Sequence, residues 1–153
     1  MNQEILLNGM KEAMSEARMA TKMGEFPYGA VIINAKGIIV SKAQDLVVRN
    51  TDVTKHAEIE AVRAAVAKLG SDLNGCALVS NIEPCAMCST AAWWARISII
   101  AYGLSQDELY ALNPNSMDEP GLTVEEALCK FKRKVEIISG LLYGENLSLW
   151  KIF

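Results

Sequence analysis

The sequence lacks the features that mark membrane, secreted and nucleic-acid-binding proteins. No apolar segment approaches the roughly 20 residues that a transmembrane helix needs. The first stretch, MNQEILLNGMKEAMSEARMA, has no basic region followed by an apolar run, so it does not resemble a secretory signal peptide. The densest basic stretch is KFKRK at 130–134 and the net charge is −3, which disfavours nucleic acid as a partner. We therefore expect a cytoplasmic protein without membrane attachment.

Histidine occurs once, and cysteine occurs four times, among 153 residues. The cytosol keeps thiols reduced, so the cysteines indicate thiol or metal chemistry rather than a disulfide framework. Hydrophobic residues make up 51% and charged residues 22%, which is too apolar for intrinsic disorder. With no internal repeat or linker, residues 1–153 are predicted to form one domain.

Apolar periodicity, turn residues and capping residues divide the chain into alternating strands and helices. The predicted helices span 4–22, 55–69, 85–96, 105–112, 123–131 and 144–153, and the predicted strands span 28–34, 37–43, 76–81, 97–103 and 134–139. Residues 113–122 contain two prolines and a glycine and are predicted to be the longest loop. This alternation predicts a layered α/β domain with its site at strand ends.

Cys85 and Cys88 are one turn apart at a predicted helix start, where backbone N–H groups favour thiolates. Neither this spacing nor the lone His56 is decisive alone, but three N and S ligands would leave a fourth tetrahedral position for water, as in a catalytic zinc site. Cys76 and Cys129 could in principle complete a closed four-ligand site. Their places in an apolar strand and on an apolar helix face favour the core instead.

Glu58 follows His56 by two positions at the start of a predicted helix. Residues two apart project about 200° from each other in mid-helix, but in the first turn both side chains can approach one metal-bound water. A carboxylate placed there can take a proton from that water and deliver it to a leaving group.

These two motifs, HAE and PCAMC, resemble the H-x-E…P-C-x-x-C signature of the zinc-dependent cytidine deaminase superfamily. FPYGAVII before them is similar to the family's first strand, and the resemblance extends from the first helix to Leu112. It implies a three-layer α/β/α fold with a central mixed sheet of about five strands. It also implies that His56, Cys85 and Cys88 hold zinc and that Glu58 carries protons.

Within the superfamily, EPCAMCSTAAWWARI and HAEIEAVRAA look most like bacterial guanine deaminases and tRNA adenosine deaminases. This likeness implies that the backbone near Ala57 and Pro84 touches the heterocycle and that Phe26 and Trp94 wall the pocket. Because adjacent helical residues cannot face one pocket, either Trp93 or Trp94 is expected to be structural. The likeness further implies a homodimer in which C-terminal segments are exchanged.

The sequence departs from the guanine deaminase pattern in two places. Asp45, eleven residues before His56, stands where the family carries a substrate-binding asparagine; an asparagine amide donates and accepts hydrogen bonds, whereas an ionised aspartate only accepts them. An alignment slip, or a solvated turn at Asp45, remains open. In the second, the loop NPNSMDEP offers Asp118 or Glu119 as a loose match to the family's acidic pair, and the chain stops at Phe153 where the family has a tyrosine-bearing extension.

The expected activity is zinc-dependent hydrolytic deamination of a small amino-substituted heterocycle with release of ammonia. Guanine, a related purine, a pyrimidine or a triazine are the candidate substrates. One alternative is a tRNA adenosine deaminase, which needs a basic surface. Another is a non-catalytic zinc-stabilised module, in which the loss of Glu58 would be expected.

Overall fold

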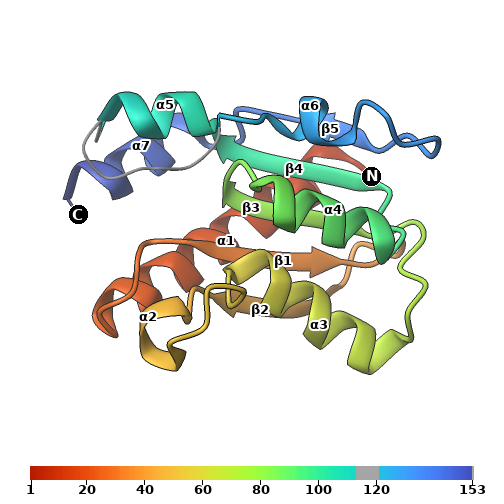
Figure 1. Cartoon of the computed structure of the whole chain (residues 1–153), viewed down its shortest axis with the longest axis horizontal. Coiled ribbons are helices and arrows are strands. Elements are labelled where there is room, and N and C mark those ends of the chain that lie inside the picture. Colours follow the sequence, from red (N-terminus) through yellow and green to blue (C-terminus); the bar gives the residue numbers. More distant parts are fainter. Residues whose placement is uncertain (113–120, 153) are drawn as a thin grey trace.

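The structure, a computed structural model, describes residues 1–112 and 121–152 of the chain (Figure 1). Its helices are α1 (Gln3–Lys22), α2 (Val47–Asn50), α3 (Ala57–Leu69), α4 (Ala86–Trp94), α5 (Gln106–Leu112), α6 (Val124–Leu128) and α7 (Tyr143–Ile152). Its strands are β1 (Gly29–Ile33), β2 (Ile39–Gln44), β3 (Ala77–Ile82), β4 (Ile99–Leu104) and β5 (Glu136–Ile138). No helix in this described part of the chain is long and apolar enough to cross a membrane.

The strands form one mixed sheet in the order β2-β1-β3-β4-β5. Strand β1 runs antiparallel to both β2 and β3, whereas β3, β4 and β5 are parallel to one another. Parallel neighbours need a crossover, which helix α4 supplies between β3 and β4. The five-stranded mixed sheet expected from the sequence is confirmed.

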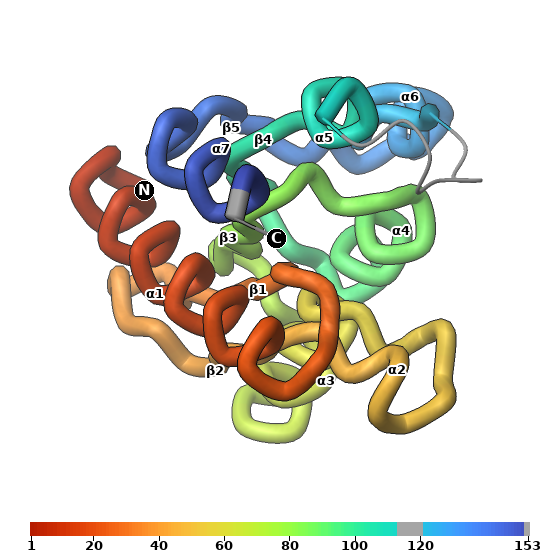
Figure 2. Tube along the Cα trace, turned by 90° about the vertical axis from the view of Figure 1, so that its left-hand side faces the viewer, coloured from red at the N-terminus to blue at the C-terminus, as the bar shows by residue number. Residues whose placement is uncertain are grey.

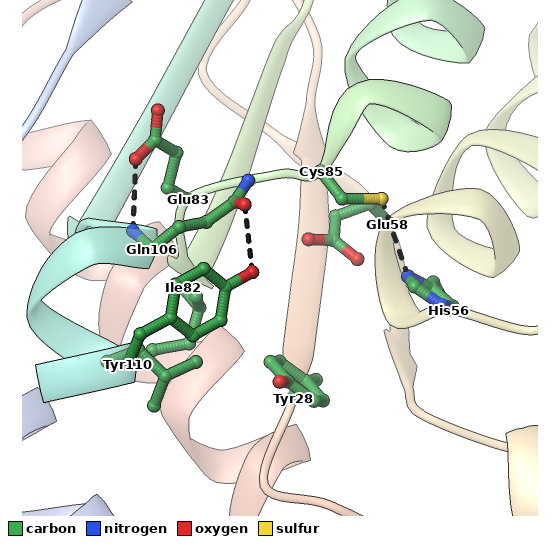
Figure 3. Close-up of a pocket in the computed structure, with 9 residues that line it drawn as sticks. Tyr28, His56, Glu58, Ile82, Glu83, Cys85, Gln106 and Tyr110 are labelled. Carbon is green, nitrogen blue, oxygen red and sulfur yellow. Dashed lines mark hydrogen bonds between the residues drawn. The ribbon is translucent and has the colours of Figure 1, made fainter. Parts of the chain in front are cut away.

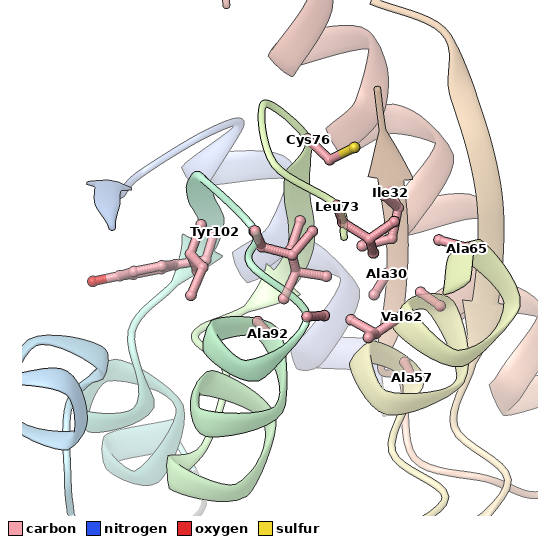
Figure 4. Packing of buried hydrophobic residues seen from close by; sticks show 14 of the residues in the cluster. Ala30, Ile32, Ala57, Val62, Ala65, Leu73, Cys76, Ala92 and Tyr102 are labelled. Carbon is pink, nitrogen blue, oxygen red and sulfur yellow. The ribbon is translucent and has the colours of Figure 1, made fainter. Parts of the chain in front are cut away.

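Helices cover both faces of this sheet, so the three-layer arrangement is also confirmed. Figure 2 shows α1 on one side of the sheet and α3 and α4 on the other. Alternate residues of β1 explain the division: Val31 and Ile33 pack toward α1, and Ala30 and Ile32 pack toward α3 and α4. Figure 4 shows the hydrophobic core between the sheet and helices α3 and α4, which contains Ala30 and Ile32.

Close contact between α1 and β1 depends on Gly29. A Cβ atom at this position would overlap the Ala13 carbonyl oxygen of α1, so any other residue would push the helix away from the sheet. Gly29 is the first residue of β1 and directly follows Tyr28, which lines a pocket together with His56 and Cys85.

Two local expectations were wrong. Helix α2 was not predicted, and the helix expected over 123–131 ends at Leu128. Cys129, which was expected in the core, is exposed, whereas Cys76 is buried as expected.

Candidate active site

Three side chains that can bind a metal meet where α3 and α4 begin. His56 and Cys85 are the N-cap residues of these helices, and neither side chain makes a capping hydrogen bond. Each points toward the other: His56 Nδ1 lies 3.7 Å from Cys85 Sγ and 3.6 Å from Cys88 Sγ. All three potential ligand atoms lie within 4.8 Å of one another, and no other such group was found in the part of the chain that the structure describes.

The donor set and its spacing fit zinc. Tetrahedral zinc bonds of about 2.0–2.1 Å to nitrogen and about 2.3 Å to sulfur place those ligand atoms about 3.6 Å apart, which matches the two N···S distances of 3.6 and 3.7 Å. Cys76 and Cys129 are not part of this group. His56, Cys85 and Cys88 are therefore positioned to bind the metal.

The two N-cap ligands are electrostatically coupled in the metal-free chain. Hydrogen bonds from Cys88 and His56 lower the pKa of the Cys85 thiol to about 4, although burial opposes this effect. The hydrogen bond with Cys85 in turn raises the pKa of His56 to about 9. Both shifts favour a Cys85 thiolate, which is the form that binds metal, beside a protonated His56, and metal binding would release the imidazole proton.

Glu58 reaches the same place from the first turn of α3. Its side chain is buried, the Ser80 hydroxyl of β3 donates to Oε1 at 3.1 Å, and Oε2 lies 3.6 Å from Cys88 Sγ. Burial raises the pKa of Glu58 to about 7. A carboxyl group with such a pKa can both accept and donate a proton near neutral pH.

A pocket opens in front of these residues (Figure 3). Apart from His56, Glu58 and Cys85, it is lined by Tyr28, Ile82, Glu83, Gln106, Leu109 and Tyr110. Figure 3 shows the Glu58 carboxyl group between the Cys85–His56 pair and the Tyr110 ring. None of these six residues was predicted from the sequence. Tyr28 and Glu83 lie within the FPYGAVII and EPCAMCSTAAWWARI motifs, but no sequence signal marks α5 as a pocket wall.

Ala57 and Pro84, whose backbone is expected to touch a substrate, are direct neighbours of the metal ligands His56 and Cys85. Ala57 is fully buried and follows His56 directly. The Pro84 carbonyl, next to Cys85, accepts hydrogen bonds from Ser89 Oγ at 3.0 Å and from Gln106 Nε2 at 3.2 Å. This carbonyl therefore organises the loop between β3 and α4.

Asp45 is buried, with 3% of its surface exposed, so the solvated-turn interpretation is wrong. Its Oδ1 accepts the N–H of Val47 at 2.8 Å and thereby supports the start of α2. Burial raises the pKa of Asp45, and the charge of the nearby His56 opposes that rise. Asp45 is close to the metal ligands but is not among the residues that line the pocket.

The two aromatic residues expected to form the pocket walls, Phe26 and Trp94, are not among the residues that line the pocket. Phe26 is half exposed beside the pocket residue Tyr28, with ring centroids 6.4 Å apart. Trp94 is 71% exposed and lines a separate surface depression with Trp93, Arg96 and Arg133, so this chain does not bring it to the pocket. Trp93 packs against Phe131 and is the structural member of the pair.

Helix α7 contacts the pocket of its own chain. Trp150 meets Tyr28 edge to face, with centroids 5.2 Å apart, and with Leu147 it packs against the small core cluster of Ile82, Leu104 and Leu109. The C-terminal helix thus supports the pocket wall from behind. Asp118, Glu119 and Phe153 lie outside the described residues.

Comparisons with known proteins agree with this geometry. A family model described as the cytidine and deoxycytidylate deaminase zinc-binding region matches residues 3–104. The probable cytosine deaminase of Schizosaccharomyces pombe is 35% identical over 146 residues, which cover 94% of this chain and 89% of that protein. The guanine deaminase of Bacillus subtilis is 42% identical over 77 residues, which cover 50% of this chain and 49% of that protein.

Two further matches concern proteins of tRNA modification. The tRNA(Ile)-lysidine synthase of Deinococcus deserti is 42% identical over 110 residues, 71% of this chain but 21% of that protein, so the chain spans about a fifth of this relative's length. A solved structure from studies of A-to-I editing by tRNA:A34 deaminases is similar with a TM-score of 0.79 and 28% identity, covering 93% of this chain and 98% of that chain.

Proposed function

Because the chain belongs to the cytidine and deoxycytidylate deaminase zinc-binding family, we propose that it hydrolytically deaminates a small, free amino-substituted heterocycle. Guanine and cytosine are the first candidates, since relatives are described as guanine deaminase and probable cytosine deaminase. A related purine, pyrimidine or triazine base is of the same chemical class. Water enters the reaction and ammonia leaves.

The residue types that line the pocket are the observation that favours a free base as the substrate. The lining combines two tyrosines, two aliphatic side chains and two carboxyl groups, and among the described lining residues there is no lysine or arginine. Such a surface suits a flat, uncharged ring with polar edges. Its described lining therefore offers no lysine or arginine side chain to a phosphate, which a nucleotide within an RNA would bring with it.

Each residue of the site has a distinct role in this proposal. His56, Cys85 and Cys88 would hold zinc, which when bound acts as a Lewis acid and lowers the pKa of a water toward about 7. Glu58 takes one proton from the attacking water and delivers it to the ring nitrogen as the C–O bond forms. It then transfers the remaining hydroxyl proton to the amine as the C–N bond breaks, so that the carbonyl base and ammonia result. Its hydrogen bond from Ser80 holds the carboxyl group in place during both transfers.

The test is ammonia release from a panel of guanine, adenine, cytosine, isocytosine and melamine by the zinc-loaded protein. Glu58→Gln, prepared in parallel, controls for contaminating deaminases. Release from at least one base by wild type and not by the variant supports the proposal. A wild-type preparation with one zinc per chain that releases no ammonia from any base would contradict it.

A second candidate, deamination of adenosine in tRNA, is favoured by the similarity to the tRNA:A34 deaminase structure over nearly its whole length. The net charge of −3 opposes it, because binding to RNA depends mainly on cationic side chains that neutralise phosphates. Inosine formation in tRNA transcripts, together with inactivity on the free bases, would select this second function.

A further inference from the structure

Glu83 is a buried acid, 3% exposed, that follows β3 and precedes Cys85 by two positions. Its carboxylate points away from the metal ligands, toward α5 (Figure 3). Oε2 accepts the backbone N–H of Gln106 at 3.0 Å, and Oε1 accepts the backbone N–H of Val124 at 2.8 Å. These amides belong to the first residues of α5 and α6, two helices separated in the chain by residues 113–123.

Helix α6 needs this acceptor although it already has a capping box. The Thr123 hydroxyl accepts the N–H of Glu126, and the Glu126 carboxylate accepts the N–H of Thr123. This reciprocal pair leaves the N–H of Val124, the first helical residue, without a local acceptor. Val124 is fully buried, so Glu83 supplies an acceptor where water has little access.

Helix α5 repeats the arrangement. Ser105 Oγ accepts the N–H of Glu108 at 3.2 Å, and Glu108 Oε2 accepts the N–H of Ser105 at 2.8 Å. The N–H of Gln106, which is again the first helical residue and again buried, is left to Glu83. One carboxylate therefore satisfies the same position in two helices.

The tie to α5 extends into the pocket. The Gln106 side-chain amide donates to the Pro84 carbonyl at 3.2 Å and accepts from the Tyr110 hydroxyl at 3.0 Å. Helix α5 is thus attached twice to the loop that carries Cys85, once through the Glu83 carboxylate and once through the Pro84 carbonyl. Gln106 and Tyr110 both line the pocket.

Helix α6 connects the same carboxylate to the metal-binding helix. It packs against α4, which carries Cys88, and Val124 shares the core cluster of the α4 residue Ala92. Glu83, in the loop that carries Cys85, is therefore hydrogen-bonded both to α5, which lines the pocket, and to α6, which packs against α4.

We propose that Glu83 is a positioning residue: it fixes the pocket wall of α5 relative to the metal-binding loop and makes α5 and α6 move as one unit. It touches neither metal nor substrate in this role, and its kinetic consequence rests on the function proposed above. Glutamine at position 83 would offer one acceptor and one amino group. At any moment one of the two buried N–H groups would face the amide NH2 instead of an oxygen, and because the amide can turn over, each helix would lose its acceptor for part of the time.

The first test measures hydrogen exchange by mass spectrometry in Glu83→Gln and needs no substrate. Leaving a buried amide unsatisfied shifts local opening by about tenfold. We expect amide exchange in 104–112 and in 121–128 to accelerate by about this factor together. In the control Glu126→Gln, both segments should keep wild-type exchange, because glutamine also serves in a capping box. Acceleration of one segment alone, or of neither, would overturn the proposal.

The second test separates positioning from general destabilisation. Cobalt-loaded Glu83→Gln should keep the thiolate-to-metal absorption of wild type, since the ligands are untouched. With the panel base that wild type deaminates fastest, KM should rise by about tenfold while kcat changes by less than about threefold, as expected for lost ground-state positioning. Accelerated exchange of both helices with an unchanged KM would make Glu83 a purely structural residue and overturn the proposal.

Two arrangements keep these tests decisive. If Glu83→Gln does not fold, Glu83→Asp retains the charge and both acceptors on a side chain one methylene shorter. It cannot reach both amides at once, so α5 and α6 should again both lose protection, though less. If no free base is deaminated, the proposed function fails while the exchange experiment still decides whether Glu83 couples the two helices.

Discussion

Replacing Glu58 by glutamine removes one ionisable group from the site and leaves the shape of the side chain almost unchanged. Glu58 is 4% exposed and accepts a hydrogen bond from Ser80 at 3.1 Å, which the glutamine carbonyl oxygen can still accept. The fold and the three metal ligands are therefore expected to survive. The variant lacks the carboxyl group that is proposed to carry protons.

The magnitude follows from the number of transfers assigned to this one carboxyl group. General acid–base catalysis is typically worth about 10²–10⁴ in rate, and here one residue serves both the attacking water and the departing amine. We expect kcat to fall by at least about 10²-fold, which corresponds to about 2.7 kcal/mol of transition-state stabilisation.

The assay is ammonia release under saturating substrate, with zinc measured in each preparation. A matched control is Glu60→Gln, two positions further along α3, because the Glu60 carboxylate pairs with Lys55 and Arg63 instead of entering the pocket. This control should keep the wild-type kcat. A Glu58→Gln protein that holds one zinc per chain and stays within about tenfold of wild type would refute the proton-carrier role.

Four further outcomes are expected. Cys88→Ser should lose most of its zinc by metal analysis whereas Cys76→Ser, changed in the core, should keep it; unaltered zinc in the first variant would exclude Cys88 as a ligand. In the zinc-free protein, burial raises the pKa of Glu58 from 4.5 to about 7, so its stabilising contribution is complete below pH 4.5 and is lost as pH rises through 7. Thermal midpoints should therefore fall over this window in wild type and fall less in Glu58→Gln; equal slopes would contradict this. Light scattering should find a homodimer, and Trp94→Glu, at a side chain 71% exposed in the single chain, should lower the dimer fraction while changing the free energy of unfolding by less than about 0.5 kcal/mol; a monomeric wild type would contradict this. Asp45→Asn should shift kcat/KM by about one to two decades toward bases that present a carbonyl, since it restores a donor; identical substrate rankings would make Asp45 a bystander.

Local sequence signals predicted those parts of the fold that local interactions stabilise. The pair Ser105 and Glu108 predicted the start of α5, and the structure contains both of its reciprocal hydrogen bonds. Helix α2 was missed because its support is tertiary. The Glu25 carboxylate, more than 20 positions away, accepts the N–H groups of Val48 and Arg49, and no periodic pattern in four residues could reveal such a partner.

The same contrast between local and tertiary support distinguishes the metal ligands, which the sequence predicted, from the pocket walls, which it did not. Cys85 and Cys88 are brought together by one helical turn, which the sequence determines directly. Trp94 was assigned to the pocket by resemblance, yet α4 points its first turn at the metal ligands, and eight further residues carry Trp94 about 12 Å along the axis. Tyr110 and Gln106 line the pocket from α5, whose first residue is hydrogen-bonded to Glu83 and Pro84, more than 20 positions away in the sequence.

The metal ligands and most of the helices around the pocket lie in different parts of the chain. The metal ligands and Glu58 all precede the end of β4 at Leu104, which is also where the family match ends. Helices α5, α6 and α7, which build or support the pocket wall, all follow it. The part of the chain after Leu104, about a third of its length, can therefore be exchanged to alter the pocket wall without changing a metal ligand. In a chimera joined after β4, the incoming segment must supply the two backbone N–H groups that the Glu83 carboxylate accepts.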